Sequence, residues 1–241
     1  MEAVGLVAIP LALLLLPTRW DVGAVALTFA GGAIGGFGLI LFYRAMAIGV
    51  IGVVAPITAV IAAALPTAVG VLAGGERLRI GQAAGILAGL VAIVLINGGG
   101  STAGKGARQA VALAMVAGIG FGLFFILFHE ASSAGVPAFV SGRAGSATVA
   151  VAYALIARVS VLPGRNAMRL IALGGSLDGI GVVLYMYATV HGLLSISALL
   201  TSFYPAFTIL CARLVLHERL NAVQLAGAAL AIIAVAAIAI T

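Results

Sequence analysis

The chain has 241 residues, of which 64% are hydrophobic and only 7% are charged, and its mean hydropathy is +1.31. Soluble domains average roughly 45–50% apolar and about 25% charged residues, so this composition excludes an ordinary soluble protein and indicates a chain that lives in lipid. The net charge of +6 is spread without a dense basic block, so we expect no nucleic-acid partner. The single cysteine, Cys211, excludes an internal disulfide.

Apolar segments long enough to cross a bilayer follow one another along the chain. About 20 helical residues cross the hydrocarbon core, where only helices or closed barrels satisfy the backbone. Strand alternation is absent, so we expect helices, and a shorter apolar run at residues 4–17 precedes them. The predicted spans are residues 22–46, 50–73, 80–97, 107–128, 136–157, 168–190, 193–216 and 222–240. The sequence therefore predicts an all-α, polytopic membrane bundle of nine helices.

Both halves of the chain carry the same motif, a Glu-Arg-Leu triplet followed by Gln and Gly, at an offset of 142 residues. Upstream of the triplet, further identities continue at an offset of 143 residues. The first set is Ala45, Gly49, Ala55, Thr58, Glu76, Arg77, Leu78, Gln82 and Gly85, and the second is Ala188, Gly192, Ala198, Thr201, Glu218, Arg219, Leu220, Gln224 and Gly227. In a membrane protein such a duplication is typical of two bundles that face a central path.

We expect the first repeat at residues 1–99 and the second at residues 105–241. At this offset residues 105–142 have no counterpart in the first half, so the first repeat is predicted to lack its first helix. The run at 4–17 would then be the remnant of the second helix of a ten-helix parent. Because five helices per repeat is an odd number, the two repeats are predicted to be inverted relative to each other.

Pairs of glycines spaced four residues apart occur in several predicted helices. Small residues at this spacing let helix backbones approach closely in lipid, so we interpret the pairs as packing surfaces, with sliding interfaces as the alternative. The pairs are Gly31/Gly35, Gly32/Gly36, Gly81/Gly85, Gly85/Gly89, Gly118/Gly122 and Gly175/Gly179.

The order of these elements resembles a known family. An aromatic-rich helix, Ala-x-x-x-Gly, a Pro-bearing helix, Glu-Arg-Leu and a final Gln-x-x-Gly helix occur twice, with prolines at Pro56, Pro66 and Pro205. This pattern resembles the EamA repeat of the drug/metabolite transporter superfamily. The resemblance implies two inverted five-helix repeats around a central cavity and transport of small organic molecules, often outward and often driven by a proton or by exchange.

Membrane orientation has two opposed indications. Arginine and lysine residues are more numerous on the side of the central linker 98–106, which the positive-inside rule places in the cytoplasm. The resemblance implies that both chain ends are cytoplasmic, which would place the same linker outside. Orientation is therefore left open.

Asp178 is the foremost candidate for a functional residue. It lies near the middle of the predicted span 168–190, between pairs of glycines that leave room for water or substrate. A charge at this depth costs several kcal/mol, so it marks a path or an ion pair. Arg143, in the preceding span, is the expected partner. Asp178 could bind a proton or a cationic group during transport, or the two residues could form a static structural pair.

Aromatic and hydroxyl-bearing residues supply the remaining candidates for a substrate or proton path. Tyr185 lies two turns beyond Asp178 on the same helical face. The others near it or in the first half are Tyr187, His191, Tyr43 and Arg44. An interfacial aromatic belt is the alternative for those at helix ends.

The span 193–216 is the most polar one, since it carries Ser195, Ser197, Thr201, Ser202 and Tyr204 ahead of Pro205. A proline frees a backbone carbonyl and kinks a helix, which can create a binding site. The alternative is that these hydroxyls bond back to their own helix. Glu76 and Arg77, with Glu218 and Arg219, are expected to shape the turns between helices and not to touch substrate.

We interpret the chain as a secondary transporter of small organic solutes or metabolites in a bacterial plasma membrane. No nucleotide-binding, metal-binding or nucleophile motif is complete, so we expect no cofactor, no metal and no enzymatic activity. Two alternatives remain open: a non-transporting membrane scaffold or assembly subunit, and a homodimer in which two shortened chains complete each other.

Overall fold

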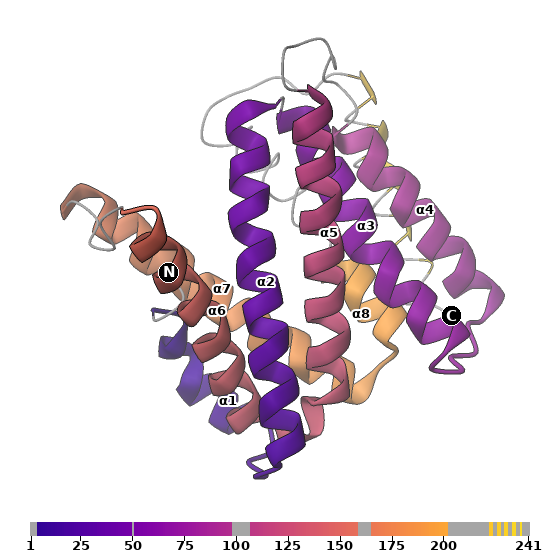
Figure 1. Ribbon diagram of the computed structural model, residues 1–241. Helices are drawn as coiled ribbons and strands as arrows, with labels where there is room; N and C mark the ends of the chain where they lie inside the picture. The colour runs from indigo at the N-terminus through magenta and orange to yellow at the C-terminus, as the bar shows by residue number, and fades with distance from the viewer. Residues whose placement is uncertain are drawn as a thin grey trace. The chain divides into compact units, whose positions relative to one another are not determined.

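The computed structural model describes residues 4–49, 51–97, 107–158, 165–201, 222–223, 226–227, 229–230, 233–234 and 237. These residues are almost all helical, and apart from one isolated bridge they include no strand pairing. The elements are η1 (Val4–Ala8), α1 (Ile9–Leu15), α2 (Val22–Ile48), α3 (Ile51–Leu72), α4 (Ile80–Asn97), α5 (Ala107–Glu130), η2 (Ser132–Ala134), α6 (Val136–Ile156), α7 (Arg165–His191) and α8 (Leu194–Thr201). Figure 1 labels the α-helices.

The predicted all-α class is confirmed, and α2 to α7 begin and end within a few residues of the predicted spans. Four of the described helices are long and apolar enough to cross a membrane: Val22–Ile48, Arg108–Glu130, Val136–Ile156 and Met168–His191. The short apolar run near the start forms η1 and α1. Of the predicted span 193–216 only the part up to Thr201 is described, and of 222–240 only isolated helical residues, so the count of nine helices stays a prediction.

The chain divides into two compact units, and each unit takes a segment from each half of the sequence. The first unit comprises Met1–Ile40 and Leu123–Gly192, and the second comprises Leu41–Gly122 and Leu193–Thr241. Contacts between helices therefore join residues that are far apart in the sequence. The two predicted repeats, which follow the chain, are a different division and stay a prediction.

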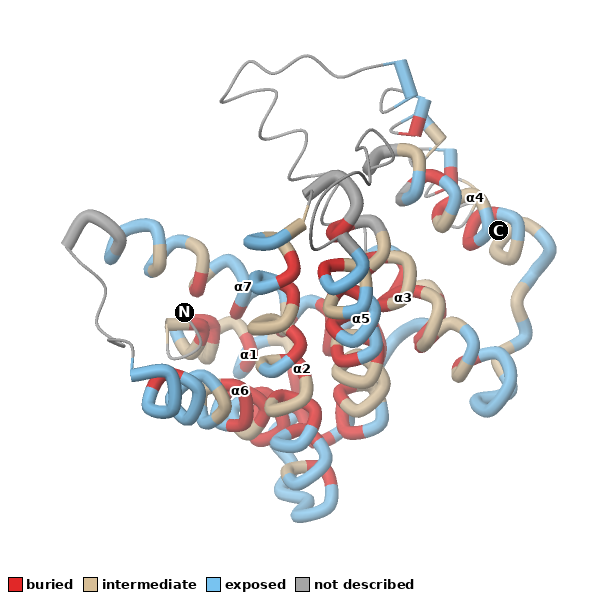
Figure 2. Tube along the Cα trace, turned by 45° about the horizontal axis from the view of Figure 1, so that its top comes forward, coloured by how far each residue is buried: buried red, intermediate tan, exposed pale blue. Residues whose placement is uncertain are grey.

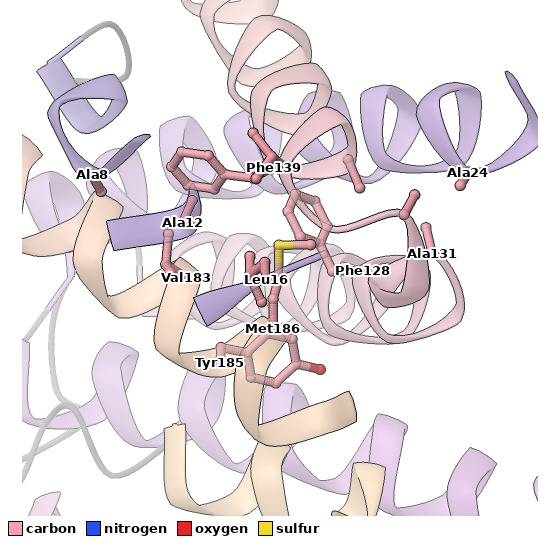
Figure 3. Close-up of a cluster of buried hydrophobic side chains, with 13 residues drawn as sticks. Ala8, Ala12, Leu16, Ala24, Phe128, Ala131, Phe139, Val183, Tyr185 and Met186 are labelled. Carbon is pink, nitrogen blue, oxygen red and sulfur yellow. The ribbon is translucent and has the colours of Figure 1, made fainter. Parts of the chain in front are cut away.

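The core of the first unit forms around α1 (Figure 3). Ala12 of α1 is buried, and so are Ala8 and Leu16, the two residues that flank this helix. They pack in one cluster with Phe128, Phe139, Val183 and Met186, among others. In Figure 2 the first turns of α6 are accordingly buried, whereas its last turns are exposed.

Two faces of α2 in the first unit carry glycines at the predicted four-residue spacing. A Cβ added at Gly32 would collide with the carbonyl of Gly142, and one at Gly36 would lie 3.0 Å from the Cα of Ser146, so both face α6. Gly31 and Gly35 face α5 instead, where Leu127 and Phe124 approach them. The interpretation of these pairs as packing surfaces is confirmed, because side chains there would force the helices apart.

A short backbone link ties the end of α1 to the turn before α6. The amide of Val136 donates to the carbonyl of Pro17 at 2.9 Å, and that of Arg19 donates to Ala134 at 3.2 Å. Gly135 has a φ of +65°, and a Cβ there would collide with the carbonyl of Pro17. Only glycine fits this turn without strain.

The second unit is organised around α3, which packs against α4 and α8. Ala59, Ala63, Ile86 and Leu199 are buried together in its core. On another side, α3 meets α5 through Gly118 and Gly122, where added Cβ atoms would lie 2.8 Å from Ile61 Cβ and 2.9 Å from Leu65 Cδ2. The hydroxyl of Thr58 donates to Ala114 of α5 at 3.2 Å as well as to its own helix.

Helix boundaries recur along the chain at a constant spacing. Helix α2 runs from Val22 to Ile48 and α7 from Arg165 to His191, so both ends differ by 143 residues. The starts of α3 at Ile51 and α8 at Leu194 differ by the same number. This spacing equals the offset of the sequence identities upstream of the Glu-Arg-Leu triplets.

Candidate functional site

An ion pair joins α6 and α7 inside the apolar helices of the first unit. The Nη1 atom of Arg143 donates to Oδ2 of Asp178 at 2.5 Å, and Nη2 donates to the backbone carbonyl of Asp178 at 3.1 Å. The guanidinium also lies over the ring of Phe139, 5.5 Å from its centroid. The structure therefore brings together the two residues that the sequence analysis paired.

The two members of this pair differ strongly in exposure. The side chain of Arg143 is only 6% exposed, whereas that of Asp178 is 51% exposed. Arg143 is covered by η1, because a Cβ added at Gly5 would lie 3.1 Å from its guanidinium carbon. Beside Asp178, one turn further along α7, a Cβ at Gly181 would meet no atom within 4 Å. The cation is thus enclosed by protein, and open space lies next to the carboxylate.

The close cover over Arg143 depends on a second glycine. A Cβ at Gly179 would collide with the backbone of Gly5, so η1 crosses α7 with its backbone almost touching the helix. Since Gly179 directly follows Asp178, this crossing places Gly5 beside the ion pair. The sequence predicts a packing role for Gly179, which belongs to a four-residue glycine pair, whereas no such spacing marks Gly5.

A second polar cluster lies in the second unit, at the start of α8. Oε1 of Glu76 accepts the amide of Leu194 at 2.6 Å, and Oε2 accepts the amide of Ser195 at 3.3 Å and its hydroxyl at 2.5 Å. The hydroxyl of Ser195 also contacts the carbonyl of Thr67 at 3.3 Å. Glu76 thus contacts the start of a helix far along the chain, whereas the sequence predicted only that it shapes the turn between neighbouring helices.

The predicted path residues of α8 are partly described. Ser197 is buried, and the hydroxyl of Thr201 donates to the carbonyl of Ser197 at 2.8 Å, so it bonds back to its own helix. The other candidates of this span, Ser202, Tyr204 and Pro205, lie outside the described residues, as do Glu218 and Arg219. Arg77 is exposed next to Glu76.

Tyr185 occupies the core of the first unit. It is 3% exposed, its hydroxyl donates to the carbonyl of Phe125 at 2.7 Å, and its ring packs on Phe125 with centroids 4.9 Å apart. Although it shares a helical face with Asp178, the neighbouring α5 buries only the Tyr185 end of that face. Tyr185 therefore connects α7 to α5, and its place on a path stays a prediction.

The aromatic residues at helix ends are exposed. Tyr187 and His191 stack with centroids 4.4 Å apart, and Nδ1 of His191 lies 2.9 Å from the carbonyl of Tyr187. Tyr43 and Arg44 are likewise exposed near the end of α2. Because Tyr187 and His191 belong to the first unit and Tyr43 and Arg44 to the second, their convergence on one path stays a prediction.

Among the described residues, no cluster of three or more His, Cys, Asp or Glu side chains has the spacing of a metal site. Arg143 and Asp178 form an ion pair between two of the described spans. The chemistry available to this arrangement is therefore exchange of a proton or an ionic partner at a carboxylate beside a fixed cation.

Comparison with known proteins gives three findings. The model of the EamA-like transporter family matches residues 108–240, which is more than half of the chain. A solved crystal structure whose description names no activity has a TM-score of 0.67 and 16% identity, covering 99% of this chain and 97% of that one, which supports a shared fold. No curated protein matches the sequence.

The family match confirms the resemblance seen in the repeated motifs and, with the apolar helices, shows an integral multi-pass membrane protein. Members of this family are transporters, which fits the expectation of a non-enzyme. The chain belongs to the EamA-like transporter family and is a membrane transporter.

Proposed function

We propose that this transporter carries a small organic solute or metabolite across a bacterial plasma membrane by alternating access, and that Asp178 binds a proton or a cationic group during the cycle. A gradient of protons or of a counter-solute supplies the energy, and net movement is outward. The observation that supports this proposal is the half-exposed carboxylate of Asp178 within an apolar, membrane-length helix.

The free-energy cost of placing the Asp178 carboxylate inside a membrane-length helix favours a role in transport. A carboxylate at bilayer depth costs roughly 2.5–3.5 kcal/mol on insertion scales, and ionisable residues there usually pair or line a path. Arg143 offsets part of this cost, but it is held by contacts besides the carboxylate, namely the Asp178 carbonyl and the Phe139 ring. Arg143 can therefore remain in place while Asp178 exchanges its partner, as a residue that binds and releases cargo must.

The same proposal includes the repeat organisation. Two inverted repeats, at residues 1–99 and 105–241, would provide the two states of alternating access by rocking against each other. The 143-residue spacing of helix boundaries supports the duplication. At this offset Asp178 corresponds to Gly35, which packs against Phe124, so the carboxylate is a feature of one repeat alone.

The experiment uses purified protein in proteoliposomes. A thermal-shift screen of metabolites identifies solutes that stabilise the protein, and uptake of each hit is then measured with and without a pH gradient. Asp178→Asn is compared with Glu130→Gln, which changes an exposed carboxylate at the end of α5. We expect Asp178→Asn to lose gradient-driven transport and Glu130→Gln to retain it.

The outcomes separate the possible roles. If Asp178→Asn still exchanges solute but no longer responds to the pH gradient, Asp178 carries the proton. If it loses solute binding as well, the carboxylate binds the solute itself. An unchanged rate and an unchanged pH dependence would remove Asp178 from the mechanism, and a wild type that binds and moves no solute would favour the scaffold alternative.

A further inference from the structure

We infer that Glu76 is a positioning residue: its carboxylate, supplied by the connection between α3 and α4, holds the start of α8 and thereby places the helix whose hydroxyls the sequence predicts to line a path. The functional part of this inference rests on the proposed function. The structural part can be tested independently of transport.

The contacts at the start of α8 are those of a helix cap. The first amides of a helix have no partner within it, and an acidic group there satisfies them and interacts favourably with the helix dipole. A cap is usually a side chain just before the helix. Gly192 and Leu193 precede α8 and carry no side-chain acceptor, whereas the Glu76 carboxylate accepts the amides of both Leu194 and Ser195.

Glu76 is itself held in place by the end of α3. Its amide donates to the carbonyl of Gly70 at 3.0 Å. A Cβ added at Gly70 would lie 2.7 Å from Oε2 of Glu76 and 2.8 Å from Oγ of Ser195, so the absent side chain makes room for the carboxylate. The Ser195 hydroxyl has one hydrogen to donate, and it lies 2.5 Å from the carboxylate and 3.3 Å from the carbonyl of Thr67, so the carboxylate is its nearer acceptor.

These contacts make the position of α8 depend on the end of α3 and on the connection that follows it. Thr67 and Gly70 lie near the end of α3, Glu76 lies in the connection that follows, and all three converge on the first turn of α8. Thr201 lies at the other end of the described helix, about two turns from the cap. Movement of the connection would therefore shift or release the start of α8 and reorient the hydroxyls beyond it.

The structural test is amide hydrogen exchange of the full chain in lipid nanodiscs. We expect the amides of Leu194 and Ser195 to exchange slowly in the wild type and about five- to tenfold faster in Glu76→Ala, as loss of a capping hydrogen bond predicts. Glu130→Gln is the matched control and should leave them unchanged. Gly70→Ala, which crowds the carboxylate, should reproduce the Glu76→Ala pattern by a second route.

A rescue variant distinguishes the carboxylate from general packing. The double substitution Glu76→Ser with Ser195→Asp moves the negative charge from the connection to the first turn of α8. We expect it to restore slow exchange of the Leu194 amide, because an acidic group in the first turn serves the same helix dipole. If the amides of Leu194 and Ser195 exchange as slowly in Glu76→Ala as in the wild type, the inference is wrong, whatever the transport result.

The functional test measures KM and maximal rate for a solute identified by the screen. We expect Glu76→Gln to raise KM by about three- to tenfold, the factor that corresponds to the free energy of one capping hydrogen bond. The double variant Glu76→Ser with Ser195→Asp should bring KM most of the way back to the wild-type value. A variant with fast amide exchange and unchanged KM and rate would show that α8 carries no path residues. If the wild type moves no solute, the proposed function fails, and the exchange result still decides whether Glu76 positions α8.

Discussion

The contact between α3 and α5 makes a quantitative prediction about Gly118. A Cβ at this position would lie 2.8 Å from Ile61 Cβ and 2.9 Å from the carbonyl of Thr58, whereas ordinary contacts begin near 3.4 Å. The alanine variant must therefore push the helices apart by about 0.5 Å, since a backbone carbonyl cannot rotate away. The displacement would stretch the 3.2 Å hydrogen bond from Thr58 to Ala114 beyond the usual limit.

The free-energy change of Gly118→Ala combines three contributions. Overpacking costs about 1–3 kcal/mol, and loss of an interhelical hydrogen bond in a membrane protein costs about 0.6 kcal/mol. Replacing glycine by alanine inside a helix returns up to about 1 kcal/mol. We therefore expect the free energy of unfolding to fall by about 0.6–3.6 kcal/mol.

The assay is reversible unfolding in mixed detergent and SDS, followed by far-UV circular dichroism. Gly181→Ala is the control, because it is also helical but meets no atom within 4 Å, and it should be neutral or stabilising by up to about 1 kcal/mol. In a Thr58→Val background, Gly118→Ala should cost less, because the hydrogen bond is already absent. Equal stability of Gly118→Ala and Gly181→Ala would refute the close crossing of α3 and α5.

Three further substitutions test the first unit. Gly135→Ala should cost at least about 1 kcal/mol more, in the same unfolding assay, than Gly75→Ala, because both glycines have a φ of +65° but only Gly135 lies against a carbonyl. Tyr185→Phe removes the hydrogen bond to Phe125, so it should lower the free energy of unfolding by about 0.6–1 kcal/mol and leave the KM of transport unchanged. Tyr153→Phe changes an exposed residue and should alter neither quantity, and a changed KM in Tyr185→Phe would place Tyr185 in the path. Arg143→Met should lower the free energy of unfolding by about 2–4 kcal/mol in the absence of any solute, because it leaves the Asp178 carboxylate without its cation. Stability should return in the double variant Arg143→Met, Asp178→Asn, and a double variant as unstable as Arg143→Met would contradict this explanation.

Helix boundaries were predictable from the sequence because they depend on local chemistry. Residues 22–46 were predicted and α2 covers Val22–Ile48, since polar and turn-forming residues at Pro17 to Asp21 interrupt the apolar run. Lipid offers no hydrogen-bond partners to the backbone, so the amides and carbonyls of each apolar run must bond within that run, and a helix is the structure that does this. The pairing of Arg143 with Asp178 was also predictable, because two opposite charges in apolar helices have few other partners.

Partners that lie far apart along the chain were decided by the tertiary structure. The spacing of Asp178 and Tyr185 places them on one helical face, yet α5 packs over Tyr185 and leaves Asp178 half-exposed. Glu76 was expected at a turn, but the helix whose start it caps begins 118 residues later, at Leu194. A sequence determines which face or end a residue occupies, because helical geometry is local, while packing between distant helices decides what that face or end meets.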